Sequence, residues 1–359
     1  MHNTAHYGLK SIQSLRAIAC ILVMLSHYQT FIYLDSVNLN SRLHFFDWGA
    51  SGVDLFFVIS GFIMAYTTKN KPNGVTQSVN FILKRAKRIL PAYYFWLLFS
   101  FAFGGAMSIF HYPEKLSSLI SAITFQPNIP NTPPNYIADD GFYIARWTLN
   151  YEIYFYIIFS LSLLFSKNVK LVLCWGMFST LAIPFYFTGH ITLSTMGYCF
   201  KSVQYMFYTN PIILEFLMGI IACYLYEKLP FITENLSLCL LILVVIALTF
   251  SFASNLTPPF NLWTGFAFSV ILILCLKCEN ILFTKTPRFI LAIGDMSYSL
   301  YLSHLPIAFI FRKNLPNMFY SLPSQIIMVC IMIIATLTLG RLSYKYIERN
   351  LPGSFLFRR

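Results

Sequence analysis

Long apolar stretches follow one another along almost the whole chain and are separated by short polar segments. A helix needs about 20 mostly apolar residues to cross a bilayer, and about ten windows of this kind occur. They lie at roughly 13–33, 48–67, 88–110, 147–166, 170–188, 209–226, 236–254, 260–277, 289–311 and 324–343. The pattern predicts an all-α fold, a polytopic transmembrane helical bundle of about ten spans, with 1–359 forming a single membrane domain.

Three regions depart from this regular pattern. The ninth stretch, 289–311, contains Gly294 and Pro306, so we expect a broken or kinked helix there. Region 189–210 is more polar and is predicted to be an interfacial loop. The Pro-rich segment 111–146 is the longest polar connection, and connections of this length are usually functional or disordered. We interpret it as a lid or acceptor-binding loop, with a passive connector as the alternative.

The charge composition supports a membrane protein and orients it. Only 11% of the residues are charged, whereas soluble domains carry about 25%. The net charge of +12 comes mainly from Lys and Arg in short connections, which the positive-inside rule explains better than binding to nucleic acid. Segment 68–87 is basic and has no acid, so it is predicted to be cytoplasmic, and ten spans then place both termini in the cytoplasm. Arg312 and Lys313 are exceptions, because this topology places them outside.

The first apolar stretch contains two ionisable residues in register. Arg16 and His27 are eleven residues apart, which is about three helical turns, so both lie on nearly the same face. The axial separation is roughly 16 Å, about half the thickness of a bilayer. Ionisable residues inside membrane helices are functional candidates. The alternative is an interfacial Arg together with a structural His.

Counting residues from the predicted outer ends of the spans places five ionisable residues in one layer. This layer, ~8–11 Å below the outer surface, holds His27, Asp54, Glu152, Glu215 and His304. A shared depth predicts a water-filled pocket or an active site open to the outside. His27 is then a candidate general base, with Asp54 or Glu152 fixing its tautomer.

A basic cluster marks the opposite surface. Four Lys and Arg occur within 84–88, and Arg16 is predicted to lie at the same level. The cluster is explained by topology and anionic lipid, or by a phosphate site built on Arg85 and Arg88. A ligand with phosphates there and a reactive end at His27 would be long and narrow, as acyl-coenzyme A is.

Motifs in chain order, spread over nearly the whole sequence, point to one family. They are the Arg16/His27 pair, GVDLFFVISGFIM with Asp54 and Ser60, Arg85-x-x-Arg88, WTLNYEIYFY with Trp147 and Glu152, ILEFLMG with Glu215, GDMSYSLYLSHLPI with Tyr298, Tyr301 and His304, and the closing YIERNLP. Together they resemble the integral-membrane acyltransferase family 3, which modifies cell-surface sugars. Thr148 and Ile153 depart from the family pattern, which has Ser and often Glu there.

The resemblance implies the chemistry and its participants. An acyl group, most often acetyl, passes from acyl-coenzyme A (acetyl-CoA) as donor substrate to a hydroxyl of a sugar or polysaccharide, free or lipid-linked. No permanently bound cofactor and no metal is expected, and the partners are the two substrates and the lipid bilayer. The expected location is the bacterial cytoplasmic (inner) membrane. Many relatives append an extracytoplasmic hydrolase-like domain, whereas this sequence ends at Arg359, so we expect transfer within the membrane unit.

The resemblance also suggests a role for each candidate residue. The catalytic set is His27, Asp54 and Glu152; the set that binds the coenzyme A phosphates is Arg16, Arg85 and Arg88; the pocket or supporting set is Ser60, Trp147, Glu215, Tyr298, Tyr301 and His304. Ser60 is not in a GxSxG elbow, so a covalent acyl-serine route has no specific support. Gly61 either lies beside a passage for the pantetheine arm or serves ordinary helix packing.

Two other functions remain open at this stage. A proton-coupled exporter or flippase of a glycan intermediate would use the same ionisable residues as a relay, although no inverted repeat is visible. A non-catalytic scaffold for a glycan-assembly complex would not require Arg16 and His27 on one face.

Overall fold

The computed structural model describes residues 9–33, 43–104, 109–130, 132–138, 143–229, 233–314 and 321–349. In these residues the fold is all-helical and has no β-strand, which confirms the predicted class. The helices are α1 (Lys10–Tyr28), α2 (Gly52–Thr68), α3 (Val75–Gly104), α5 (Pro113–Thr124), α6 (Arg146–Ser162), α7 (Asn168–Met177), α8 (Ile183–Thr188), α9 (Val203–Tyr208), α10 (Ile213–Lys228), α11 (Glu234–Ala253), α12 (Leu262–Lys277), α13 (Glu279–Leu282), α14 (Arg288–Asp295), α15 (Ser297–Asn314) and α16 (Leu322–Ser343). Shorter 3-10 turns are η1 (Gln29–Phe31) and η2 (Asp47–Ser51), and π turns are η3 (Phe178–Ala182) and η4 (Tyr344–Glu348).

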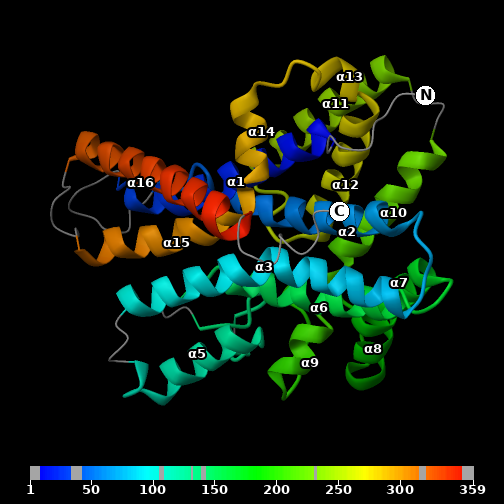
Figure 1. Ribbon diagram of the computed structural model, residues 1–359, viewed down its shortest axis with the longest axis horizontal. Coiled ribbons are helices and arrows are strands. Elements are labelled where there is room, and N and C mark those ends of the chain that lie inside the picture. Colours follow the sequence, from blue (N-terminus) through cyan, green and yellow to red (C-terminus); the bar gives the residue numbers. More distant parts are fainter. Residues whose placement is uncertain are drawn as a thin grey trace.

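The centre of the bundle is formed by α1, α2, α10 and α12, in which α2 and α12 contact each other and both α1 and α10. On one side of α1 lie α14, α15 and α16, and α3 runs alongside both α15 and α6 (Figure 1). The candidate site therefore lies where α1, α2, α3, α6 and α15 meet.

Glycines allow α2 and α10 to pack backbone to backbone. A Cβ added at Gly61 would lie 2.0 Å from the Phe216 carbonyl oxygen, and one added at Gly219 would lie 2.0 Å from the Val58 carbonyl oxygen. Neither position has room for a side chain. Gly61 therefore serves helix packing, and its suggested place beside a passage for the donor is wrong.

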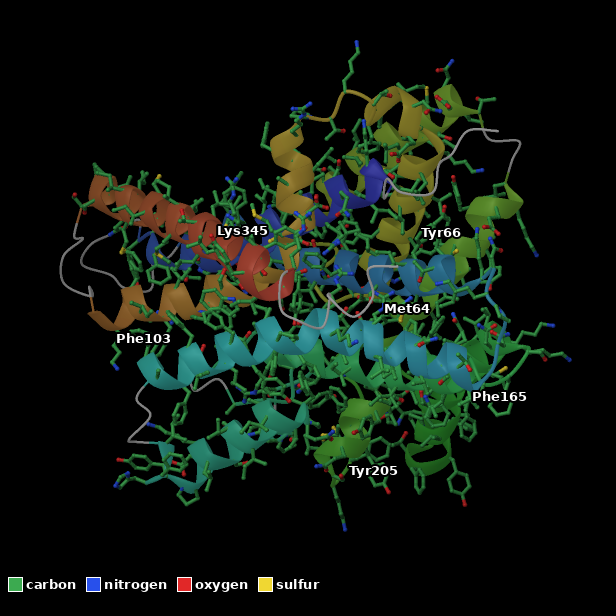
Figure 2. The ribbon with its side chains drawn as sticks, viewed as in Figure 1. Met64, Tyr66, Phe103, Phe165, Tyr205 and Lys345 are labelled. Carbon is green, nitrogen blue, oxygen red and sulfur yellow. The ribbon has the colours of Figure 1, made fainter. Side chains whose placement is uncertain are left out.

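The surface of the bundle suits a lipid environment. Large apolar side chains point outward, among them Phe103, Phe165 and Tyr205, whereas Met64 is fully buried (Figure 2). The most apolar long helix, α11, buries little more than Ser237 and Leu241. Extensive exposed apolar surface of this kind marks contact with a membrane.

The structure does not confirm the predicted number of about ten membrane spans. Among the described residues, six helical stretches are long and apolar enough to cross a bilayer, and the shorter α12 is also apolar. Helices α3, α6 and α15 belong to the same bundle but are not among the six. The predicted cytoplasmic termini, 1–8 and 350–359, lie outside the described residues.

Several local predictions can be compared with the helices. The ninth stretch is broken as expected, but between α14 and α15 at Met296, and α15 continues through Pro306. Most of the basic segment 68–87 is not a loop, because α3 already begins at Val75. Region 189–210 is largely non-helical apart from α9, and segment 111–146 contains α5.

Candidate functional site

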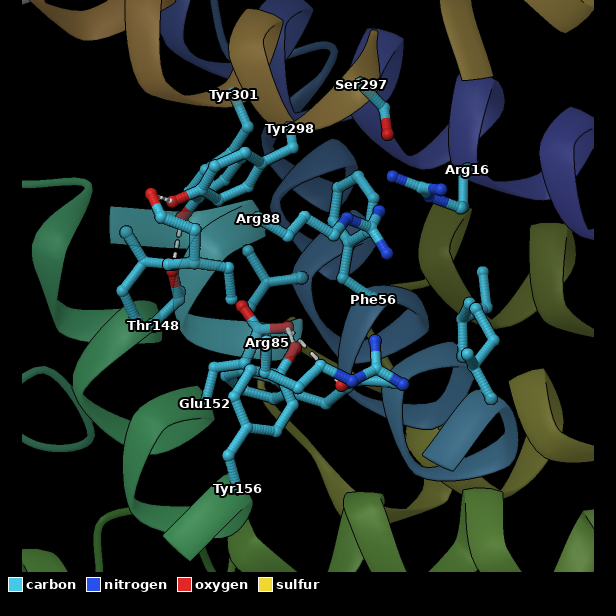
Figure 3. Close-up of a pocket in the computed structure, with 17 residues that line it drawn as sticks. Arg16, Phe56, Arg85, Arg88, Thr148, Glu152, Tyr156, Ser297, Tyr298 and Tyr301 are labelled. Carbon is cyan, nitrogen blue, oxygen red and sulfur yellow. Dashed lines mark hydrogen bonds between the residues drawn. The ribbon is translucent and has the colours of Figure 1, made fainter. Parts of the chain in front are cut away.

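Two cavities with different linings lie inside the bundle. The smaller one, of about 90 Å³, lies between α1, α2, α3, α6 and α15 (Figure 3). The larger one, of about 400 Å³, is lined by α1, α3 and α15 and by the segment that leads into α6. Seven of the predicted site residues line the smaller cavity: Arg16, Ser60, Arg85, Arg88, Glu152, Tyr298 and Tyr301.

Three guanidinium groups and one carboxylate dominate the smaller cavity. Arg16, only 8% exposed, faces Arg88 across the space, and Arg85 approaches from the same helix as Arg88 (Figure 3). The Arg85 guanidinium lies 5.4 Å from the centre of the Tyr156 ring. Glu152 accepts hydrogen bonds from the Tyr156 hydroxyl and, at 3.4 Å, from Ser60 Oγ. Three arginines and one carboxylate line the cavity, and Glu348 acts on Arg16 and Arg88 from outside the lining. The guanidinium groups suit an anionic ligand.

Hydroxyl groups fix the opposite wall of this cavity. The Tyr301 and Thr148 hydroxyls are 2.8 Å apart, and the Tyr298 hydroxyl donates to the Ile89 carbonyl oxygen at 3.0 Å. Thr148, which replaces the Ser of the family motif, keeps the hydroxyl that makes this contact.

The larger cavity has a mostly neutral lining. It is lined by His27, by aromatic side chains, and by Thr132, Asn135 and Tyr143 from the segment before α6. The Tyr143 hydroxyl and Asn135 Oδ1 are buried and have no hydrogen-bond partner among the described residues. Such groups call for a ligand or water, because an unpaired buried polar atom is costly. Burial, together with Tyr93 and Tyr301, raises the pKa of Tyr143 well above its usual range, so its hydroxyl remains a donor at neutral pH.

Three aromatic rings connect the two cavities. Tyr301 lines the smaller cavity, and its ring centre lies 5.4 Å from that of His304, which in turn lies 5.2 Å from that of His27 in the larger cavity. His304 Nδ1 is 2.6 Å from the Tyr301 carbonyl oxygen, so this nitrogen carries the hydrogen. The other nitrogen, Nε2, is buried and has no partner among the described residues. His304 thus packs against His27 in a fixed tautomer.

The five ionisable residues of the predicted layer do not line one common cavity. His27 and His304 form one group, Glu152 belongs to the arginine cavity, and Asp54 lies beside Glu215 in a third place. The reason is that each side chain faces the helices that pack against its own helix, so residues counted to one depth can point into different places.

The carboxylates predicted to orient His27 have other neighbours. Asp54 accepts a hydrogen bond from the Phe260 N–H at 3.1 Å and is fully buried together with Glu215. Trp147 packs near this pair, with its ring centre 5.2 Å from that of Phe260. Asp54, Glu215 and Trp147 are predicted site residues that line neither cavity. They lie instead where α2, α6, α10 and the start of α12 pack together.

Some lining residues were not found from the sequence. Tyr143 and Asn135 lie in the Pro-rich segment that the sequence predicts to be a lid or acceptor-binding loop. No motif within that segment identifies these two residues. Arg312 could have been noticed in the sequence, because the predicted topology places it outside, against the positive-inside rule. Within the described ranges, no group of three or more His, Cys, Asp and Glu is placed to hold a metal ion.

Comparisons with known proteins identify the family to which the chain belongs. The model of acyltransferase family 3, described as an acyltransferase domain, matches residues 9–342. The chain is 32% identical over 264 residues to the exopolysaccharide production protein ExoZ of Rhizobium meliloti (strain 1021), covering 73% of this chain and 77% of that protein. It is also 30% identical over 194 residues to the peptidoglycan O-acetyltransferase OatA of Listeria monocytogenes serovar 1/2a (strain ATCC BAA-679 / EGD-e), covering 48% of this chain and 28% of that protein. No solved structure matches the chain. The family match spans nearly all the described residues and includes both cavities, so this chain is an O-acyltransferase of the integral-membrane acyltransferase family 3.

Proposed function

We propose that the protein transfers an acyl group, most simply acetyl, from cytoplasmic acyl-coenzyme A to a hydroxyl of a cell-surface or lipid-linked sugar. The observation that carries this proposal is the pairing of a basic cavity with a larger neutral one, connected through Tyr301, His304 and His27. Family membership favours an enzyme over the exporter. We assign the protein to the bacterial cytoplasmic membrane, with the basic cavity towards the cytoplasm.

The arginines are proposed to hold the donor. Coenzyme A carries several phosphates, and guanidinium groups bind phosphate oxygens through paired hydrogen bonds. Arg85 and Arg88 lie three residues apart on α3, and Arg16 faces Arg88 from α1. A cavity of about 90 Å³ is much smaller than typical ligand sites of ~300–1,000 Å³, so it has room for only a part of the donor.

His27 is proposed to act as general base. It removes the proton of the acceptor hydroxyl as that oxygen attacks the thioester carbonyl carbon, a C–O bond forms, and the C–S bond breaks. The proton then passes to the departing thiolate, which leaves as free coenzyme A. His304 packs against the His27 ring and acts as a positioning residue.

Sealed vesicles of known orientation test this proposal. The purified protein would receive labelled acetyl-coenzyme A on one side and an oligosaccharide on the other, and labelled ester would be measured. We expect transfer only with donor on the cytoplasmic side and acceptor on the opposite side, and none with His27→Ala. If both substrates are used from the cytoplasmic side alone, the cross-membrane arrangement is wrong. An active His27→Ala enzyme would remove the general-base role.

A further inference from the structure

One charged side chain stands out in the larger cavity. Among the described residues that line it, Arg312 is the only Lys, Arg, Asp or Glu. No acidic group pairs with Arg312 in the described part of the chain, where its recorded contact is the Phe31 ring, 5.2 Å away. Arg312 lies near the end of α15, on the side that the topology prediction places outside. Arg312 is an exposed guanidinium beside a cavity, and without an acidic partner among the described residues it can bind an anion.

The rest of the lining suits a sugar. The volume of about 400 Å³ lies within the range of small-molecule sites. Tyr143 and Asn135 bring buried polar atoms that lack partners in the described residues, and these can bond to hydroxyl groups. Phe99 and Phe309 add apolar surface that can cover a sugar ring.

We propose that this cavity is the acceptor site and that Arg312 selects an acceptor sugar carrying an oxyanion, either a carboxylate or a phosphate. The inference rests on the proposed function, because it names the class of acceptor for that transfer. A guanidinium group binds either oxyanion through two parallel hydrogen bonds, which also fixes the orientation of the sugar. The accepting hydroxyl would then face His27, which lines the same cavity.

The same charge also affects the chemistry at His27. The positive charge of Arg312 acts on the His27 ring, and a general base becomes positive when it takes a proton. Two positive charges near a protein surface repel each other more strongly than they do in bulk water. An acceptor oxyanion on Arg312 offsets this repulsion, so an acidic acceptor is both bound more tightly and deprotonated more easily.

Lys313 provides a matched control. It is the next residue, carries the same charge and lies at the same helix end, but its ammonium group donates to the Phe103 carbonyl oxygen at 3.2 Å. Lys313 does not line the cavity. An effect of general surface charge or of the helix dipole would therefore be shared by both residues, whereas ligand selection belongs to Arg312 alone.

The transfer test compares three acceptors on purified protein in nanodiscs of zwitterionic lipid. The acceptors are an aryl glucuronide, an aryl glucoside 6-phosphate and the neutral aryl glucoside, with acetyl-coenzyme A as donor. We expect kcat/KM for at least one charged acceptor to exceed that for the neutral one by tenfold or more. The carboxylate and phosphate acceptors identify which oxyanion is preferred. Arg312→Gln should lower the charged-to-neutral ratio at least tenfold, and Lys313→Gln should change it less than twofold. Equal losses for all three acceptors with Arg312→Gln would overturn the proposal.

A binding measurement separates this inference from the proposed function. The same acceptors are titrated by calorimetry into the His27→Ala protein and into the His27→Ala, Arg312→Gln double variant. Binding of a charged acceptor that weakens tenfold in the double variant supports the site even if no variant transfers an acyl group. No binding, or binding that does not depend on Arg312, overturns the inference, and transfer to neutral sugars would then leave the proposed function standing.

Discussion

The two cavities differ in almost every property that matters for binding. The smaller is lined by three arginines and by a glutamate that accepts hydrogen bonds from Ser60 and Tyr156, whereas the larger has more than four times the volume, a largely neutral lining and polar atoms without described partners. The first has little free space beside its charged groups. The second has space and unsatisfied bonding groups, which a ligand of moderate size can use.

This difference implies a division of labour between two substrates. A phosphate-rich donor suits the arginines, and a hydroxyl-rich acceptor suits the neutral cavity. His27 belongs to the neutral cavity, and Tyr301 and His304 stand between it and the arginines. A substitution in one cavity should therefore affect one substrate and spare the other, and the following predictions test that separation.

The largest effect is expected at His27. Because a general base contributes ~10²–10⁴-fold to rate, His27→Ala should lower kcat by about that factor. Binding of acyl-coenzyme A should change less than twofold, since His27 does not line the arginine cavity. Single-turnover rates and donor titration of the purified variant measure both quantities. A large loss of donor affinity would show that the two cavities do not act separately.

The second effect concerns the donor. Charge-assisted hydrogen bonds are worth about 1.5–3 kcal/mol each, so replacing Arg85 and Arg88 by Lys should raise the donor KM by roughly 10–100-fold. The acceptor KM should stay within twofold. Lys84→Gln is the control, because Lys84 is an exposed neighbour on α3 that does not line the cavity. If the double Lys variant keeps its donor affinity, the basic cluster at 84–88 does not bind the donor and only orients the protein in the membrane.

A smaller effect is expected at Tyr143. A neutral hydrogen bond contributes about 0.5–1.5 kcal/mol, so Tyr143→Phe should raise the acceptor KM by roughly 2–10-fold and leave the donor KM unchanged. The free energy of unfolding should stay the same or rise, because the lost hydroxyl has no partner among the described residues.

Tyr136→Phe is the matched control for this prediction. The Tyr136 hydroxyl accepts a 3.0 Å hydrogen bond from Asn210 Nδ2 and lies in neither cavity. Its removal should lower the thermal stability without changing the acceptor KM. If the two Phe variants behave alike, the Tyr143 hydroxyl does not contact the acceptor.

The smallest effect is expected at Asp54. Asn keeps an oxygen that can accept the Phe260 N–H, and Asp54 lies beside Glu215. Asp54→Asn should therefore change kcat less than about threefold, and Asp54→Ala should cost about 1–3 kcal/mol of stability by leaving buried groups unpaired. A 100-fold loss of kcat in a stable Asp54→Asn protein would restore Asp54 as the residue that orients His27.

The sequence by itself determined the class, the family and most of the chemistry. Apolar stretches of bilayer length specify membrane helices because backbone groups in lipid must bond within their own segment. The helical period placed Arg16 and His27 on one face of α1. The motifs identified four further candidate site residues, Arg85, Arg88, Glu152 and Tyr301. These are local properties of the chain.

The tertiary structure decided which of these residues meet. It placed Glu152 with the arginines because α6 packs against α3, and Asp54 with Glu215 because α2 packs against α10 through Gly61 and Gly219. It also brought Tyr143 and Arg312 to one cavity from segments far apart in the chain. Depth and proximity depend on where each helix begins and which helix it contacts. No local pattern encodes these long-range relations, so only the packed bundle could show that the site has two cavities.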